Sequence, residues 1–110
     1  MAEHLRAALN DLRHVSAERR TEAAAAICDL AVDLAKLLPA VAGLLVVSAL
    51  IETEKEPYEQ MLFTLGELSV RSPIPSSVLA PLSDIEPSYE WDAEYIQDIL
   101  ENAAYGASDD

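Results

Sequence analysis

The side chains best suited to chemistry in this chain are carboxylates and aromatic rings in its C-terminal half. Residues 56–110 hold twelve acidic residues and one basic residue, a formal balance of −11, whereas residues 1–55 have a balance of −2. The same half contains all the aromatic residues, which are Tyr58, Phe63, Tyr89, Trp91, Tyr95 and Tyr105. A one-sided negative field attracts cationic surfaces and repels nucleic acid and anionic lipid. The composition therefore predicts a basic protein partner, and neither nucleic acid nor a membrane.

Residues of the kinds that usually carry catalysis form no recognisable set. His4 and His14 lie ten residues apart, and no third His or second Cys can complete a metal site with them. The serines lack a nearby His and acid, and the chain has no Gly-rich phosphate loop. We therefore predict no catalytic residue, no metal ligand, no cofactor and no enzyme activity. An enzyme that uses carboxylates and a metal is retained as a third hypothesis.

Four glutamates, Glu52, Glu54, Glu56 and Glu59, gather around one turn. They could form a patch for a cation or a metal. The alternative is a solvated turn in which Glu56 and Glu59 complement the N-terminus of the following helix. The second interpretation is favoured, because the Asp, Asn and Gly spacing of a calcium loop is absent.

The strongest candidate binding residues lie in the C-terminal segment. In a helix, a rotation of 100° per residue places its side chains in three stripes. The expected core stripe consists of Tyr89, Ala93, Ile96, Leu100 and Ala103. The second stripe consists of the carboxylates Glu90, Glu94, Asp98 and Glu101, and the third of Trp91, Tyr95 and Asn102.

The second and third stripes together are the predicted partner-binding surface. Aromatic anchors bordered by charge are typical of interface hot spots. No Lys or Arg follows Arg71, so no basic side chain compensates these carboxylates, whereas a solvated helix usually alternates its charges. The alternative is that Trp91 and Tyr95 pack against the connector at 72–87, whose prolines suit aromatic rings.

Apolar residues recur at helical spacing, and no stretch shows the strict alternation of a half-buried strand, so the predicted fold class is all-α. Ser16 is suited to cap the second helix, and Pro39 and Pro57 to open later ones. We expect helices at 3–13, 16–38, 39–54 and 57–71, a short one from 76 or 77, and a last one from 85–88 to 104.

Two of these helices carry more apolar residues than one stripe needs. The segment 57–71 has a core stripe of Tyr58, Met61, Leu62, Leu65 and Leu68. Phe63 and Val70 lie on its opposite side, where we expect a second neighbour to cover them. The segment 39–54 is apolar almost all round, so it is either the central helix, covered on every side, or part of an oligomer seam.

Length and composition indicate one domain at 1–105 with a flexible acidic tail at 106–110. The single cysteine, Cys28, excludes an internal disulfide, fits a reducing compartment, and is expected as a small buried thiol. The first residues lack the apolar core of a signal peptide. The longest apolar run, 37–51, falls short of the roughly 18 residues of a membrane span. We therefore expect a cytoplasmic protein.

The chain resembles itself at an offset of 38 residues, with 27–30 (Ile-Cys-Asp-Leu) matching 65–68 (Leu-Gly-Glu-Leu). An acidic-Pro turn ending at Pro57, followed by Thr-Leu-Gly-Glu-Leu at 64–68, resembles the HEAT repeat family, most closely over 44–70. The resemblance implies a right-handed α-solenoid of about three antiparallel hairpins, in which the small Gly66 lets the two helices of a unit approach. It implies a scaffold or binding module and supplies no catalytic residue.

These observations lead to two functional hypotheses. The first is an acidic binding module that neutralises a basic partner, most concretely an immunity-type inhibitor of a cationic toxin or nuclease. Its binding surface would be the second and third stripes of the last helix. The second is a structural or adaptor subunit that forms a homodimer or larger oligomer through the apolar helix at 39–54.

Overall fold

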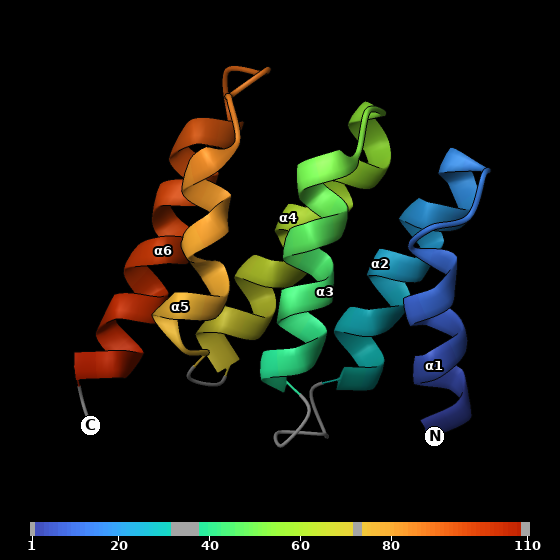
Figure 1. The fold of residues 1–110 in the computed structure, drawn as a ribbon, viewed down its shortest axis with the longest axis horizontal. Helices are drawn as coiled ribbons and strands as arrows, with labels where there is room; N and C mark the ends of the chain where they lie inside the picture. The colour runs from blue at the N-terminus through green and yellow to red at the C-terminus, as the bar shows by residue number, and fades with distance from the viewer. Residues whose placement is uncertain (1, 32–37, 72–73, 109–110) are drawn as a thin grey trace.

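The computed structural model describes residues 2–31, 38–71 and 74–108, and every regular element in these ranges is a helix. The all-α prediction is confirmed. The α-helices are α1 (Ala2–Asp11), α2 (Ala17–Ala31), α3 (Leu38–Ile51), α4 (Lys55–Arg71), α5 (Ser76–Leu79) and α6 (Asp92–Ser108). A 3-10 helix, η2 (Ala80–Asp84), continues α5, and consecutive helices run up and down beside one another (Figure 1).

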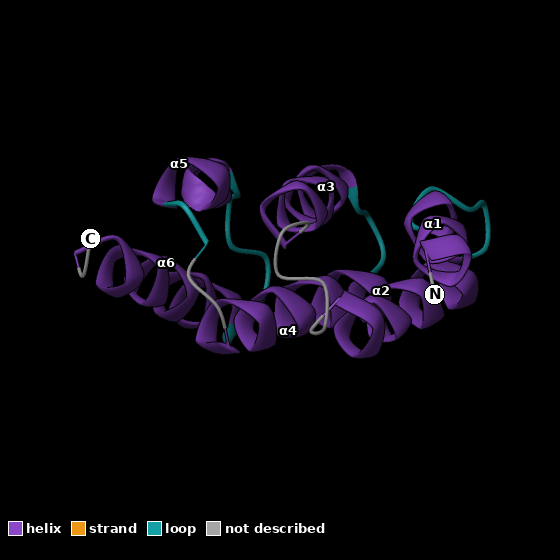
Figure 2. Ribbon diagram, turned by 90° about the horizontal axis from the view of Figure 1, so that it is seen from below, coloured by secondary structure: helices purple, strands orange, loops and turns teal. Residues whose placement is uncertain are grey.

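The helices form two layers in a slab of 38 × 35 × 16 Å. Figure 2 shows α1, α3 and α5 in one layer and α2, α4 and α6 in the other. Within the second layer α4 contacts both α2 and α6, and α3 packs across the layers on α4. The second-layer helices begin at residues 17, 55 and 92, intervals of 38 and 37 residues that lie close to the offset seen in the sequence.

The core lies between the two layers. The apolar stripe expected on α4 is confirmed, because Tyr58, Met61, Leu62, Leu65 and Leu68 are all buried. Leu5 and Ala8 of α1, together with Leu12 just after that helix, belong to the same core, and so do Ala24 and Ile27 of α2. One polar side chain crosses inside it: the buried Thr64 hydroxyl donates to the Ala24 carbonyl at 2.8 Å and joins α4 to α2.

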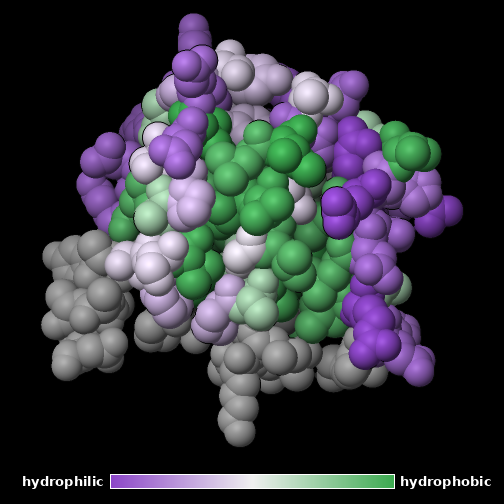
Figure 3. Space-filling model, viewed as in Figure 1, coloured by the Kyte–Doolittle hydropathy of each residue, from purple (hydrophilic) through white to green (hydrophobic). Residues whose placement is uncertain are grey.

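The sequence did not predict how much of α3 is exposed. Its outer side leaves Leu44, Val47, Leu50 and Ile51 between 40% and 66% exposed. Each layer of the slab is covered on one side only, so the first alternative for this segment, a central helix covered on every side, is wrong. Figure 3 shows the consequence, a broad apolar area over the centre of this face. The expected cover for Phe63 and Val70 on α4 is also absent, since these side chains are 45% and 73% exposed.

The start of α2 follows the expected capping. The Ser16 hydroxyl accepts the backbone N–H of Arg19 at 3.4 Å, and the helix begins at Ala17. The described part of α2 ends at Ala31, so the expected continuation to residue 38 falls largely outside the described residues.

The last helix begins later and is rotated relative to the expectation. Residues 85–91 are not helical, because Pro87 restrains residue 86 away from the helical region. The buried stripe of α6 contains Asp92, Ile96 and Ile99, whereas Ala93, expected in the core, is exposed. Residues 106–108 of the expected tail belong to α6, and residues 109–110 lie outside the described residues. No helix within the described ranges is long and apolar enough to cross a bilayer.

Candidate protein-binding site

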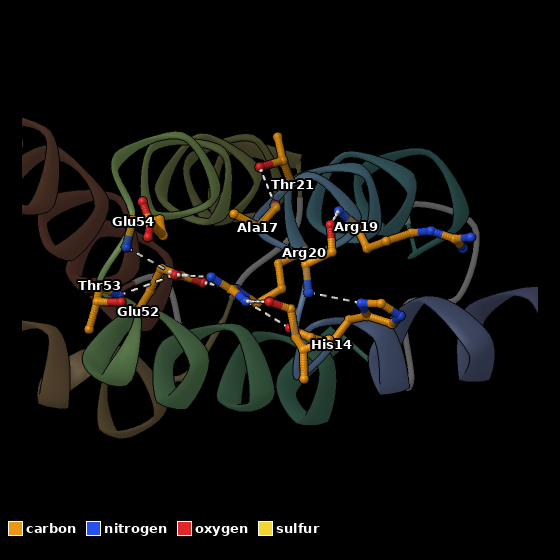
Figure 4. Close-up of polar contacts among 10 residues, drawn as sticks. His14, Ala17, Arg19, Arg20, Thr21, Glu52, Thr53 and Glu54 are labelled. Carbon is orange, nitrogen blue, oxygen red and sulfur yellow. Dashed lines mark hydrogen bonds and ion pairs between the residues drawn. The ribbon is translucent and has the colours of Figure 1, made fainter.

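Two polar ties hold the turns at one end of the slab, and the first joins the turn before α2 to the turn before α4 (Figure 4). Arg20 Nε donates to Glu52 Oε1 at 2.7 Å, and its Nη2 donates to Glu52 Oε2 at 2.9 Å. Its remaining nitrogen, Nη1, donates to the His14 carbonyl at 2.7 Å. Glu52 also accepts the backbone N–H groups of Thr53 and Glu54, both at 3.1 Å. The charge of Glu52 is therefore used inside the molecule rather than offered to an external cation.

The second tie occupies the corresponding place on the next helix of the second layer, α4. Arg20 is the fourth residue of α2, and Tyr58 is the fourth residue of α4. The Tyr58 hydroxyl donates to Asp92 Oδ2 at 3.1 Å, and the same oxygen accepts the Ser88 backbone N–H at 2.8 Å. Asp92 is fully buried. This bonding fixes the segment that precedes α6, and with it the position of Trp91.

Four aromatic rings meet beside this tie. Tyr89 stacks on Trp91 with ring centres 5.7 Å apart and planes within 6°. Tyr95 meets Trp91 edge to face at 6.2 Å and 88°. Tyr58 lies tilted against both Tyr89 and Trp91, each at 6.0 Å. Trp91 is consequently held from several sides while part of its surface stays open to solvent.

A groove of about 400 Å³ runs along this cluster between α4 and α6. Phe63, Trp91 and Tyr95 supply its apolar lining, and Glu59 and Gln60 supply its polar lining. Phe63 is 45% exposed, and both Trp91 and Tyr95 are partly buried. The groove thus presents aromatic surface next to a carboxylate, as an anchor site for a cationic group requires.

The Tyr95 side chain is surrounded by a glycine of α4 and by several carboxylates. A Cβ added to Gly66 would stand 3.3 Å from the Tyr95 ring, so the small residue makes room for a side chain of α6. Burial raises the pKa of the Tyr95 hydroxyl, and the carboxylates of Glu67, Asp98 and Glu59 raise it further. Three carboxylates therefore act on the Tyr95 hydroxyl, and one of them, Glu59, also lines the groove.

The structure brings some of the predicted site residues together and separates others. Trp91 and Tyr95 share the groove, where their rings meet edge to face, and Trp91 also contacts the rings of Tyr58 and Tyr89. All four carboxylates of the second stripe are exposed, namely Glu90, Glu94, Asp98 and Glu101. Asn102 is used in packing, since its Nδ2 donates to Ser69 Oγ at 3.4 Å.

Sequence reasoning missed the α4 half of the groove, formed by Glu59, Gln60 and Phe63. Phe63 was expected beneath a second neighbour, and Glu59 was assigned to a solvated turn. The available signal was their spacing, because residues four apart share a helix face and so place a carboxylate beside an off-core ring. The partner helix that completes the groove could not be read from that spacing.

The other candidates have structural roles or no supporting geometry. The His14 ring accepts the Ser16 backbone N–H at its Nδ1, 3.0 Å away, which stabilises the turn before α2. Among the described residues, no group of His, Cys, Asp or Glu side chains could hold a metal ion. Cys28 is partly buried in α2 rather than fully buried as expected.

Comparison with known proteins found no matching family model, no similar curated protein and no similar solved structure. Only the geometry and the charge of the described residues therefore bear on function. Chemically, the groove can bind by stacking, cation–π attraction and charge-assisted hydrogen bonding.

Proposed function

We propose that this chain is an acidic protein-binding module that neutralises a basic protein, most concretely an immunity-type inhibitor of a cationic toxin or nuclease. The observation that carries the proposal is the groove between α4 and α6, where Phe63, Trp91 and Tyr95 remain accessible beside Glu59. Large aromatic rings set in a charged surrounding are the usual anchors of a protein interface.

The distribution of charge supports a cationic partner. Helices α4 and α6 together carry seven carboxylates, and α6 has no basic residue. A surface of one sign speeds the diffusional encounter with an oppositely charged protein and makes association depend on salt. An inhibitor of this kind would bind faster at low ionic strength than at high ionic strength.

We propose that the scaffold that positions this surface is a short α-solenoid of HEAT-like hairpins. The two-layer arrangement and the near-regular starts of α2, α4 and α6 support it. The ties Arg20–Glu52 and Tyr58–Asp92 support it too, because each begins at the fourth residue of a second-layer helix and ends at an acid near the next turn.

Binding can be tested with purified basic ribonucleases and deoxyribonucleases and with the purified product of the adjacent gene. The immobilised chain should retain a basic nuclease at low salt, release it at high salt, and inhibit its activity. The double variant Trp91→Ala/Asp98→Lys should lose this binding. Asp29→Lys makes the same charge change at an exposed position of α2 and should retain it. Equal binding by the double variant and Asp29→Lys would show that the proposed surface is wrong.

A second candidate function is a structural or adaptor subunit that self-associates through α3. The observation that favours it is the exposed apolar stripe of Leu44, Val47, Leu50 and Ile51. A contiguous apolar area of this kind usually marks an interaction site.

A second copy of the chain is the occupant that the charge distribution favours. A protein with a formal charge of −13 repels itself everywhere except where charge is absent. Helices α3 and α5 contain no charged residue, so two copies can meet on this face while their acidic α4 and α6 surfaces point away from each other.

This second candidate can be tested by substituting either of two exposed valines and measuring the molar mass of each variant by size-exclusion chromatography with light scattering. Val47→Lys should convert a dimer into a monomer, because it places a charge in the centre of the α3 stripe. Val15→Lys changes a side chain that is 94% exposed and lies outside the stripe, and it should leave the dimer intact. A monomeric wild-type chain at high protein concentration would exclude this function.

A further inference from the structure

We propose that the groove between α4 and α6 binds the guanidinium group of an arginine side chain presented by the basic partner. The inference rests on the proposed function and specifies the ligand chemistry of the same site. It follows from the shape of the groove, the identity of its lining residues and the absence of a basic side chain on α6.

The shape of the groove suits a flat cation. Trp91 and Tyr95 stand at 88° to each other, so they form two walls of a corner, and Phe63 lines the same groove from α4. A guanidinium is planar and stacks on aromatic faces, which makes it complementary to walls of this kind. Because Tyr89 already covers one face of Trp91, only its remaining surface is available to a ligand.

The polar lining supplies matching hydrogen-bond acceptors. Glu59 offers a carboxylate and Gln60 offers an amide oxygen within the same groove. Arginine can stack through its plane and donate through its edge at the same time, whereas lysine presents a compact, strongly hydrated ammonium. The groove is therefore expected to prefer arginine to lysine.

The surrounding charges point the same way. The carboxylates of Asp98 on α6 and Glu59 on α4 lie close enough to Tyr95 to act on its hydroxyl, and α6 itself carries no Lys or Arg. The aromatic cluster already holds one intramolecular cation on its other side, where Lys55 Nζ lies 5.7 Å from the centre of the Tyr89 ring. The ion pair between Arg20 and Glu52 lies outside the groove.

The test uses three blocked pentapeptides with a single central arginine, lysine or glutamine between glycines. Trp91 is the only tryptophan of the chain, so its indole N–H resonance in a ¹⁵N-labelled sample reports directly on the groove. The arginine peptide should shift this resonance saturably. The lysine peptide should bind with an affinity at least about threefold lower than that of the arginine peptide. The glutamine peptide, which has no charge, should leave the resonance in place.

Two variants identify the residues responsible. Glu59→Gln removes the carboxylate and should weaken arginine binding about fivefold, while Glu56→Gln makes the same change in the first turn of α4, outside the groove, and should bind like the wild type. Phe63→Leu retains an apolar side chain at an exposed position but removes the ring, and it should weaken binding to a similar extent.

The outcomes separate this inference from the proposed function. Equal responses to all three peptides, or a Glu59→Gln variant that binds like Glu56→Gln, would overturn the arginine assignment. If the peptides fail to bind while a basic nuclease still requires Trp91, the assignment is wrong and the proposed function survives. If the arginine peptide binds as expected and no basic protein does, the assignment holds and the proposed function fails.

Discussion

Replacing Tyr58 with phenylalanine should destabilise the fold, because it removes a donor from a buried carboxylate. The Tyr58 hydroxyl donates to Asp92 Oδ2 at 3.1 Å, and the second oxygen of that carboxylate, Oδ1, has no hydrogen-bond partner among the described residues. After the change, the Ser88 backbone N–H would be the only donor that the described residues still offer to this fully buried side chain.

The size of the effect follows from the burial of both partners. Tyr58 is 6% exposed and Asp92 is 0% exposed, so water cannot replace the lost bond. A hydrogen bond to a charged group contributes about 1.5–3 kcal/mol to stability. For a domain of this size, that loss corresponds to a fall of roughly 5–15 °C in Tm.

Urea and thermal unfolding followed by circular dichroism would measure this loss. Tyr89→Phe is the matched control, since it removes a hydroxyl from the same aromatic cluster that has no carboxylate partner within the described residues. It should cost less than about 0.5 kcal/mol. A Tyr58→Phe variant as stable as Tyr89→Phe would refute the view that this tie holds the segment before α6.

Three further predictions concern pH, the first tie and the glycines. Burial, and then the charge of Asp92, raise the pKa of Tyr58 above its ordinary value of 10.0. The unfolded chain therefore releases this proton first, so the free energy of unfolding should fall as pH rises above about 10, and fall less in Tyr58→Phe. Arg20→Met should lower the free energy of unfolding, measured in urea, by about 2 kcal/mol or more, because the buried Glu52 carboxylate would lose its cationic partner. Arg19→Met should change the free energy of unfolding little. The new Cβ of Gly43→Ala would meet Val78 at an ordinary contact distance of 3.8 Å, so this change should raise the free energy of unfolding by about 1 kcal/mol and raise Tm accordingly. Gly66→Ala should raise the free energy of unfolding by less, and it should shift the Tyr95 ring resonances, because its new Cβ would stand 3.3 Å from that ring.

Local patterns in the sequence were sufficient for the helices and for much of the core. Ser16 caps the second helix as expected, and the apolar stripe of α4 is buried throughout. These features depend on residues within one or two turns of each other, so spacing alone reveals them. Helical spacing was not sufficient for Trp91, which precedes α6 and meets Tyr95 through the non-helical segment before that helix.

What the sequence could not give is which surfaces meet. The number of layers decided that α3 keeps an exposed apolar side, because a helix in an outer layer has neighbours on one side only. The hydrogen bond between Tyr58 and Asp92, residues 34 positions apart, holds the first residue of α6 against α4. The groove exists only because α4 brings Glu59 and Phe63 beside that helix. Composition thus determined the negative charge and the aromatic residues of the C-terminal half. Contacts between distant segments determined that a carboxylate and three aromatic rings lie together in one groove.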